Sequence, residues 1–403
     1  MSLFHEPQRA WRALACMGLV LAAAPLGGLA ADAARVPRVA ADYQLVHSFV
    51  GADGFKSQSA LIVSGDGQLL GTAFGGGAIG QGDGTAFRLA ADGHLTVVHS
   101  FDGRRGGEGP VGLTRANDGN FYGVTTRGGR YLQGTAYRMS PQGEVTVLHS
   151  FHQDGQDGST PQAPLLQASD GHFYGTTSYG GHHGWGCVFR LRAQGQFSVL
   201  HSFDNDGHDG QGPGQAGLIQ ARDGDLYGST QGGGEHSQGI VFRLRADGSL
   251  SILHSFQGPD GRAPSSALIE ALDGQFYGVT AGGGAYGRGT VYRLGRDGGF
   301  TVLHAFSGRH GDGADPAGDL LLARDGQFYG VTQRGGRYDG GIVYRITADG
   351  TFSRLHSFNP SGPDGHMPWA GLVEVGDGEF YGSTYQGGAH DAGGIFRIRI
   401  RLR

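Results

Sequence analysis

Apolar residues recur along the chain in short runs that are separated by turn residues. One stretch contains four such runs, Pro164–Ser169, His172–Thr177, Cys187–Leu191 and Gln196–Phe203. Each run is rich in β-branched or aromatic residues, a composition that is typical of strands. Helical periodicity of 3.6 residues is absent after the first 30 residues. The pattern therefore predicts an all-β chain built from units of four antiparallel strands.

The four-run unit is repeated seven times. Its closing histidine recurs at intervals of 52, 50, 52, 53, 50 and 52 residues, as His47, His99, His149, His201, His254, His304 and His356. A fixed period of this length indicates a repeat architecture. We expect these histidines to pack or hydrogen-bond between neighbouring repeats.

The two ends of the repeat region fall within a repeat. The chain enters through a lone fourth strand, Tyr43–Phe49, and leaves through a third strand, Gly394–Arg403. If the first strand completes the last unit, the ring closes and hides strand edges that would otherwise promote aggregation. The sequence thus predicts a seven-bladed β-propeller of four-stranded antiparallel blades. A parallel β-helix is the alternative, suggested by the glycine-rich stretch Gly76–Gly84.

Turn chemistry separates two kinds of connection. Asp-Gly joins the first and second runs in all seven repeats, as at Asp170 and Asp223, and such dipeptides supply the positive φ angles of short hairpins. The second-to-third and inter-repeat connections are longer. Binding residues favour loops on a rigid scaffold, so we expect a binding site on the face that carries the long loops.

The N-terminal segment has the features of an export signal. Arg9 and Arg12 precede the apolar run Ala13–Leu29, and small residues follow it, which is typical of a secretory signal peptide. We therefore expect residues 1–30 to be the signal peptide, with cleavage as late as residue 33. Residues 31–42 then form a short linker and 43–403 a single propeller domain. The expected location is secreted or periplasmic, without a transmembrane segment.

Charge and cysteine content narrow the partners. The formal net charge is −5 and Lys56 is the single lysine, so the chain has no basic footprint for nucleic acid. Cys187 is the only cysteine beyond the signal, which excludes an intrachain disulfide in the exported protein. We expect a monomer whose partner is a carbohydrate or an extracellular protein.

Two segments resemble a known family. The stretches "F-Y-G-T-T-S-Y-G-G" at Phe173–Gly181 and "V-L-H-S-F" at Val199–Phe203 are similar to the GloVer tandem repeat of exported bacterial proteins, a group of choice-of-anchor proteins. The resemblance covers nearly the whole chain after the signal. It implies a propeller-like fold and does not specify an activity.

Departures from the repeat mark candidate binding residues. Exposed aromatic rings can stack on sugar rings, and arginines can hydrogen-bond hydroxyl or acidic groups. The long loops carry such residues at Trp185, Trp369, His182, His183, Arg127, Arg130, Tyr131, Arg334, Arg337 and Tyr338. The alternative is structural: Trp369 would merely begin an inner strand, and Trp185 would pack within its loop.

Signals for catalysis or metal binding are weak. The stretch Asp204–Gly210 has oxygen ligands spaced like part of a calcium loop, but its glycine comes early and no late glutamate follows. A glycosidase needs two carboxylates that flank one bond, and no two of the glutamates after the signal form a recognisable couple. We expect no catalytic residue, no metal ligand and no cofactor, with calcium as the one ion to test.

The sequence favours an exported, non-catalytic module that binds a glycan or protein through its long-loop face. One alternative is a propeller hydrolase or lyase with a central-channel, calcium-dependent site. The other is a purely structural surface protein.

Overall fold

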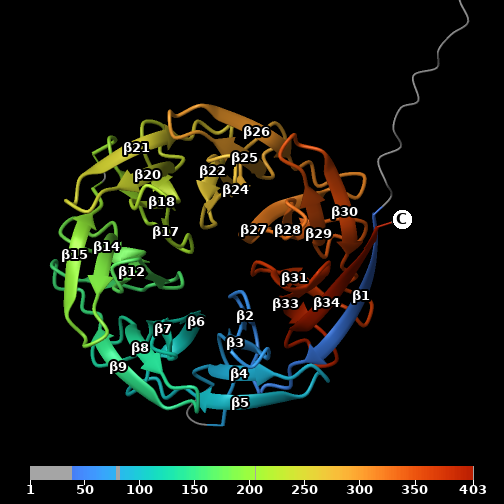
Figure 1. Cartoon of the computed structure of the whole chain (residues 1–403), viewed down its shortest axis with the longest axis horizontal. Coiled ribbons are helices and arrows are strands. Elements are labelled where there is room, and N and C mark those ends of the chain that lie inside the picture. Colours follow the sequence, from blue (N-terminus) through green and yellow to red (C-terminus); the bar gives the residue numbers. More distant parts are fainter. Residues whose placement is uncertain (1–38, 79–81, 205, 403) are drawn as a thin grey trace, which may run out of the picture. The chain divides into compact units, whose positions relative to one another are not determined.

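Seven antiparallel sheets are arranged around a central axis in the computed structural model, which describes residues 39–78, 82–204 and 206–402 (Figure 1). This arrangement confirms the predicted all-β, seven-bladed β-propeller and rules out the β-helix. The predicted signal peptide and most of the predicted linker lie outside the described residues. Within the described part of the chain, no helix has the length and apolar character that crossing a membrane requires.

Each blade is an antiparallel sheet in which the strands follow one another in chain order from the central axis to the outer edge (Figure 1). Blade 1 contains β2 (Ile62–Val63), β3 (Leu69–Ala73), β4 (Thr85–Leu89) and β5 (Leu95–Ser100); blade 2 contains β6 (Glu108–Arg115), β7 (Phe121–Arg127), β8 (Thr135–Met139) and β9 (Val145–Ser150); blade 3 contains β11 (Leu166–Gln167), β12 (Phe173–Thr177), β14 (Cys187–Leu191) and β15 (Phe197–Ser202); blade 4 contains β17 (Ile219–Gln220), β18 (Leu226–Thr230), β20 (Ile240–Leu244) and β21 (Leu250–Ser255).

The remaining blades follow the same order. Blade 5 contains β22 (Arg262–Pro264), β23 (Ile269–Glu270), β24 (Phe276–Gly282), β25 (Thr290–Leu294) and β26 (Phe300–Ala305); blade 6 contains β27 (Gly313–Leu322), β28 (Phe328–Gly335), β29 (Ile342–Ile346) and β30 (Phe352–Ser357); blade 7 contains β31 (Gly365–Pro368), β32 (Val373–Gly376), β33 (Glu379–Gly387) and β34 (Gly394–Leu402). Two short ribbons extend blades 3 and 4: β10 (Gly158–Ser159) with β13 (Tyr179–Gly180), and β16 (Gly210–Gln211) with β19 (Gly232–Gly233).

The first strand of the chain completes the last blade. β1 (Val39–Ser48) pairs antiparallel with β34 from Val39 opposite Leu402 to Ser48 opposite Gly394. It begins before the predicted Tyr43 and ends at Ser48. The two ends of the propeller therefore lie side by side in one sheet, which closes the ring as the sequence predicted.

The core lies between the blades. The second strand of each blade carries a glycine that faces the aromatic side chain of the third strand: a Cβ at Gly228 would lie 2.6 Å from the Phe242 ring. Because glycine has no side chain, a buried aromatic residue fits on the third strand of every blade. Aromatic rings of neighbouring blades also stack on each other. The ring centroids of Tyr122 in blade 2 and Phe173 in blade 3 are 3.9 Å apart.

The closing histidines tie one blade to the next. Six of them place Nε2 close to an aspartate carboxylate in the following inter-blade loop. The pairs are His47–Asp53 (2.8 Å), His149–Asp157 (2.8 Å), His201–Asp209 (2.9 Å), His254–Asp260 (2.9 Å), His304–Asp312 (3.1 Å) and His356–Asp364 (3.4 Å). Several of the rings also stack on the outer strand of the next blade, as His149 does on Phe197 with centroids 4.0 Å apart. The predicted packing between repeats is confirmed.

Candidate functional site

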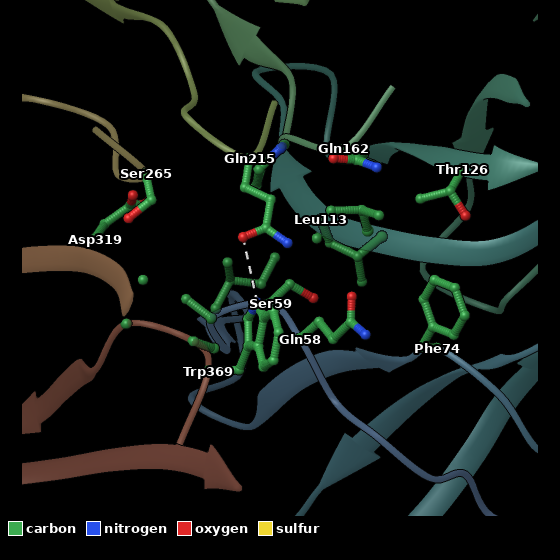
Figure 2. A pocket seen from close by; sticks show the side chains of 18 of the residues that line it. Gln58, Ser59, Phe74, Leu113, Thr126, Gln162, Gln215, Ser265, Asp319 and Trp369 are labelled. Atoms are coloured by element: carbon green, nitrogen blue, oxygen red, sulfur yellow. Dashed lines mark hydrogen bonds between the residues drawn. The ribbon is translucent and has the colours of Figure 1, made fainter. Parts of the chain in front are cut away.

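A cavity of about 400 Å³ lies at the centre of the ring, and every blade contributes to its wall. Because strands within a blade are antiparallel, both kinds of long loop come to the same face, and the cavity opens among the segments that follow the inter-blade loops. Its side chains include Gln58 and Ser59 of blade 1, Leu113 of blade 2, Gln162 of blade 3, Gln215 of blade 4, Ser265 of blade 5, Asp319 of blade 6 and Trp369 of blade 7 (Figure 2). We call this the central cavity.

In each blade, the segment that follows the inter-blade loop contributes to the wall of the central cavity, as residues 263–268 of blade 5 do through Ser265, and we call it the wall segment. One backbone hydrogen bond recurs at the start of every wall segment and positions it. The residue before the wall segment's first proline has a positive φ, for example 49° at Ala263 and 53° at Met367. Its N–H donates to a carbonyl in the second-to-third loop of the preceding blade, at 2.8 Å from Ala263 to Gln238 and 2.9 Å from Met367 to Gly340. Unfavourable backbone angles are kept only where the surroundings enforce them. Each wall segment is therefore tied to the blade that precedes it.

Trp369 reaches across the central cavity. It directly follows β31 of blade 7, yet its indole Nε1 donates to the Oε1 of Gln215 in blade 4, 3.3 Å away. Figure 2 shows this hydrogen bond spanning the opening. The indole also lies against the Tyr385 ring, with centroids 5.2 Å apart. An aromatic surface is thus fixed in the middle of the ring, where a ligand can stack on it.

Two polar groups of the cavity wall lack full hydrogen bonding. The Ser265 hydroxyl oxygen is buried and has no partner among the described residues. Asp319 accepts one hydrogen bond, from the backbone N–H of Ala267 to Oδ1 at 2.7 Å, and burial raises the pKa of its carboxyl. Buried polar groups without partners cost free energy, so this part of the wall is suited to a polar ligand.

Trp185 and its neighbours lie away from the central cavity. The Trp185 side chain is partly buried against the hydrophobic cluster between blades 3 and 4, which includes Val188 and Phe203. His182 and His183 are exposed in the same loop. The Nδ1 of His183 lies 3.7 Å from the carboxylate of Asp204, far for a hydrogen bond.

Of the predicted arginine and tyrosine residues, Arg127 alone joins Trp369 in lining the central cavity. Arg127 is largely exposed, and its guanidinium lies 3.5 Å from the carboxylate of Glu108. The other candidates form separate pairs on the loops of blades 2 and 6: Arg130 lies over Tyr131 and Arg337 over Tyr338, each at 5.3 Å from the ring centroid. The structure therefore divides the predicted residues between the cavity and the outer loops.

Arg334 belongs to a second cavity that the sequence did not reveal. This cavity, of about 420 Å³, lies between blades 5 and 6 and is also lined by Tyr286, Arg288, Arg309 and Asp339. Arg288 and Arg309 come from two different loops and Arg334 from the end of β28, so only the fold brings them together. Their side chains are exposed, which weakens any attraction for an anion through solvent screening.

The calcium-like stretch has structural roles instead. Asp209 pairs with His201, and Asp206 accepts the backbone N–H of His208 at 2.7 Å within its own loop. Among the residues that the structure describes, no three His, Cys, Asp or Glu side chains are placed to hold a metal ion together.

The missed cavity residues left a faint signal in the sequence. Each wall segment ends at a buried leucine. In six repeats the residue before that leucine is small or a proline. In blade 6 the same position holds Asp319. Aligning the repeats and searching for polar departures finds this residue. The same alignment places Gln58, Gln162 and Gln215 three residues before the buried leucine, the position that Trp369 has in blade 7.

Solved structures with a similar fold share little sequence. The extracellular domain assigned to a hybrid two-component system of B. thetaiotaomicron matches with a TM-score of 0.57 and 13% identity, over 88% of this chain and 40% of that one. A protein of unknown function from Dyadobacter fermentans matches with a TM-score of 0.49 and 11% identity, over 90% of this chain and 99% of that one. A gluconolactonase from Xanthomonas campestris matches with a TM-score of 0.43 and 15% identity, over 72% of this chain and 85% of that one. At such identities the likeness concerns the fold alone.

Sequence comparison identifies the family directly. No curated protein sequence is similar to this chain. A family model described as the Gloeobacter/Verrucomicrobia repeat matches residues 34–221 and residues 213–401, nearly the whole of the repeat region. This match confirms the resemblance inferred from the repeated "F-Y-G" and "H-S-F" stretches. The chain therefore belongs to the Gloeobacter/Verrucomicrobia repeat family.

Proposed function

We propose that this protein is an exported propeller that binds a carbohydrate in its central cavity without transforming it. The observation that carries the proposal is Trp369, held in the middle of the ring by its hydrogen bond to Gln215 and surrounded by amide and hydroxyl side chains. A ligand with an apolar face and many hydroxyl groups fits this combination. Carbohydrates have both features.

The physical basis is complementarity of two kinds. The face of an indole attracts the C–H groups of a sugar ring, while amides donate to and accept from its hydroxyl groups. Gln58, Gln162 and Ser59 supply such groups around the indole. A volume of about 400 Å³ lies within the range of small-ligand sites. This size favours the end of a glycan or a short oligosaccharide over the side of a long chain.

Binding is favoured over catalysis by the carboxylate content of the site. Hydrolysis of a glycosidic bond ordinarily uses two carboxyl groups on either side of that bond. Asp319 is the single carboxylate among the described residues that line the central cavity. Export is proposed from the signal-like residues 1–30, which also implies that the ligand is met outside the cytoplasm.

Tryptophan fluorescence of the protein that lacks residues 1–30 tests the proposal. Trp185 and Trp369 are then its only indoles. The protein is titrated with a panel of polysaccharides and oligosaccharides, with and without calcium. We expect a saturable change with at least one glycan, and we expect Trp369→Ala to abolish both this change and binding measured by calorimetry.

Trp185→Phe is the matched control, because it removes the other indole and keeps an aromatic side chain in the blade 3–4 packing. This variant should retain the saturable fluorescence change on titration with the glycan. Loss of the signal in Trp185→Phe with retention in Trp369→Ala would place binding on the outer loop and contradict the proposal. A flat response to the whole panel, supported by calorimetry, would also contradict it.

A further inference from the structure

We propose that Asp319 recognises a positively charged amino group, so that the ligand of the central cavity is a glycan containing amino sugars with free amines. This inference rests on the proposed carbohydrate binding and specifies its ligand. It concerns a residue that departs from the repeat, lies in the cavity wall and forms no ion pair with any residue in the described part of the chain.

Asp319 interrupts an otherwise uncharged position. It directly precedes the buried Leu320 of blade 6. The corresponding residues in the other blades are Ala60, Gly112, Pro164, Gly217, Ala267 and Gly371. Since six blades fold with a small residue or a proline here, the architecture does not require a carboxylate. The aspartate is therefore an addition to the scaffold.

The surroundings of Asp319 leave its charge uncompensated. Its one hydrogen bond is the neutral N–H of Ala267. Among the described residues, none forms an ion pair with it. Of the cationic side chains that the structure describes, Arg127 alone lines the central cavity, and its guanidinium lies beside Glu108. A carboxylate withdrawn from water is unfavourable unless it is paired.

An ammonium group on the ligand satisfies this part of the wall. It donates to the Asp319 carboxylate, which Figure 2 draws at one edge of the cavity. The indole of Trp369 offers a cation an attractive ring face in the same space. Burial raises the pKa of Asp319, because the ionised carboxylate is poorly solvated there; a bound ammonium group supplies the opposite charge that favours the ionised form.

The test compares oligosaccharides that differ only in their amino substituents. Glucosamine, N-acetylglucosamine and glucose oligomers of equal length are titrated into the protein that lacks residues 1–30, with calorimetry and tryptophan fluorescence as readouts. We expect the glucosamine oligomer to bind at least about tenfold more tightly than either neutral oligomer, the size of one charge-assisted hydrogen bond. Asp319→Asn should remove this preference and leave neutral oligomers within about twofold.

A second variant guards against misfolding. Asp319→Ala introduces the residue that blades 1 and 5 carry at this position, so it should fold normally and show the same loss of preference. Equal affinities for charged and neutral oligomers, unchanged in both variants, would overturn the inference while leaving the proposed function intact. Absence of binding to all three oligomers and to the wider panel would instead contradict the proposed function.

Discussion

At the scale of single residues, the closing histidines of several repeats combine two contacts, as His149 does. Its ring packs against the outer strand of the next blade, and its Nε2 reaches an aspartate in the loop between the two blades. The loop between blades 1 and 2 is the exception, because Gly106 occupies the position that aspartate has in the other inter-blade loops. The Gly106 carbonyl accepts the hydroxyl of Thr135 at 3.1 Å, as the Asp53 carbonyl accepts that of Thr85 at 2.9 Å. His99 therefore lacks the carboxylate that the other six histidines have.

Restoring the missing aspartate should stabilise the protein. A Cβ at Gly106 would have no neighbour closer than 3.7 Å, and the backbone there does not have a positive φ. We predict that Gly106→Asp raises the free energy of unfolding by about 1 kcal/mol, through one new hydrogen bond and a less flexible unfolded chain. Urea denaturation measures the change. Gly106→Ala separates the backbone effect, and equal stability of the two variants would refute the role of the carboxylate.

The same variant should change the response to acid. Burial lowers the pKa of His99 below its ordinary value of 6.5, so its contribution to stability is present above that pH and decreases as the pH falls through the lowered pKa. A carboxylate beside the ring raises the pKa of His99. Titration of the His99 ring by NMR should show this increase in Gly106→Asp, together with a smaller acid-induced loss of stability.

At the scale of elements, ring closure depends on one strand. β1 pairs with β34 along its whole length, and Tyr43 stacks on His356 of blade 6 with centroids 4.0 Å apart. The last blade therefore receives its outer strand from the start of the chain. Without β1, the N–H and C=O groups along the outer edge of β34 would lose their partners, and the His356 ring would lose its cover.

Deletion of residues 39–48 should expose the edge of β34 and cause self-association, because an unpaired edge strand is a template for another chain. We expect soluble oligomers or aggregates in size-exclusion chromatography with light scattering, and a lower melting temperature. A chain that begins at Val39 is the control and should remain monomeric. A deletion variant that stays monomeric with an unchanged melting temperature would refute closure by β1.

At the scale of the whole molecule, the central cavity exists only when all seven blades are in place. Each blade supplies one wall segment, and the Trp369–Gln215 hydrogen bond joins two blades that are remote along the chain. A ligand that touches several of these segments binds the closed ring and not the unfolded chain. Binding and global stability should therefore be linked.

A glycan that binds in the central cavity should raise the melting temperature. At a ligand concentration of 100 times Kd, the expected stabilisation is about 2.7 kcal/mol. Differential scanning calorimetry measures the shift, which Trp369→Ala should abolish. Tyr131→Ala alters an exposed ring of the blade 2 loop and should leave the shift unchanged; loss of the shift in this control would move the site to the outer loops.

The candidate site was predictable only in part. Trp369 was accessible to sequence analysis because tryptophan is rare here and departs from the repeat. Arg127 was also found, although its equivalent in blade 6, Arg334, lies in a different cavity. Gln58, Gln162 and Gln215 were not among the predicted residues, although each stands three residues before a buried leucine, the position that Trp369 has in blade 7. The repeat pattern shows that these positions are equivalent, whereas their meeting around one cavity depends on closing the ring.

The number of blades, the strands, the tight turns and the closure by the first strand could be read from the sequence. These features follow from local periodicity, turn residues and the repeat count, which are all properties of neighbouring residues. The folded chain was needed to show which side chains meet at the centre, which histidine lacks its aspartate, and that no described residue forms an ion pair with Asp319. Such facts depend on contacts between residues far apart in the chain, and closing the ring is what creates those contacts.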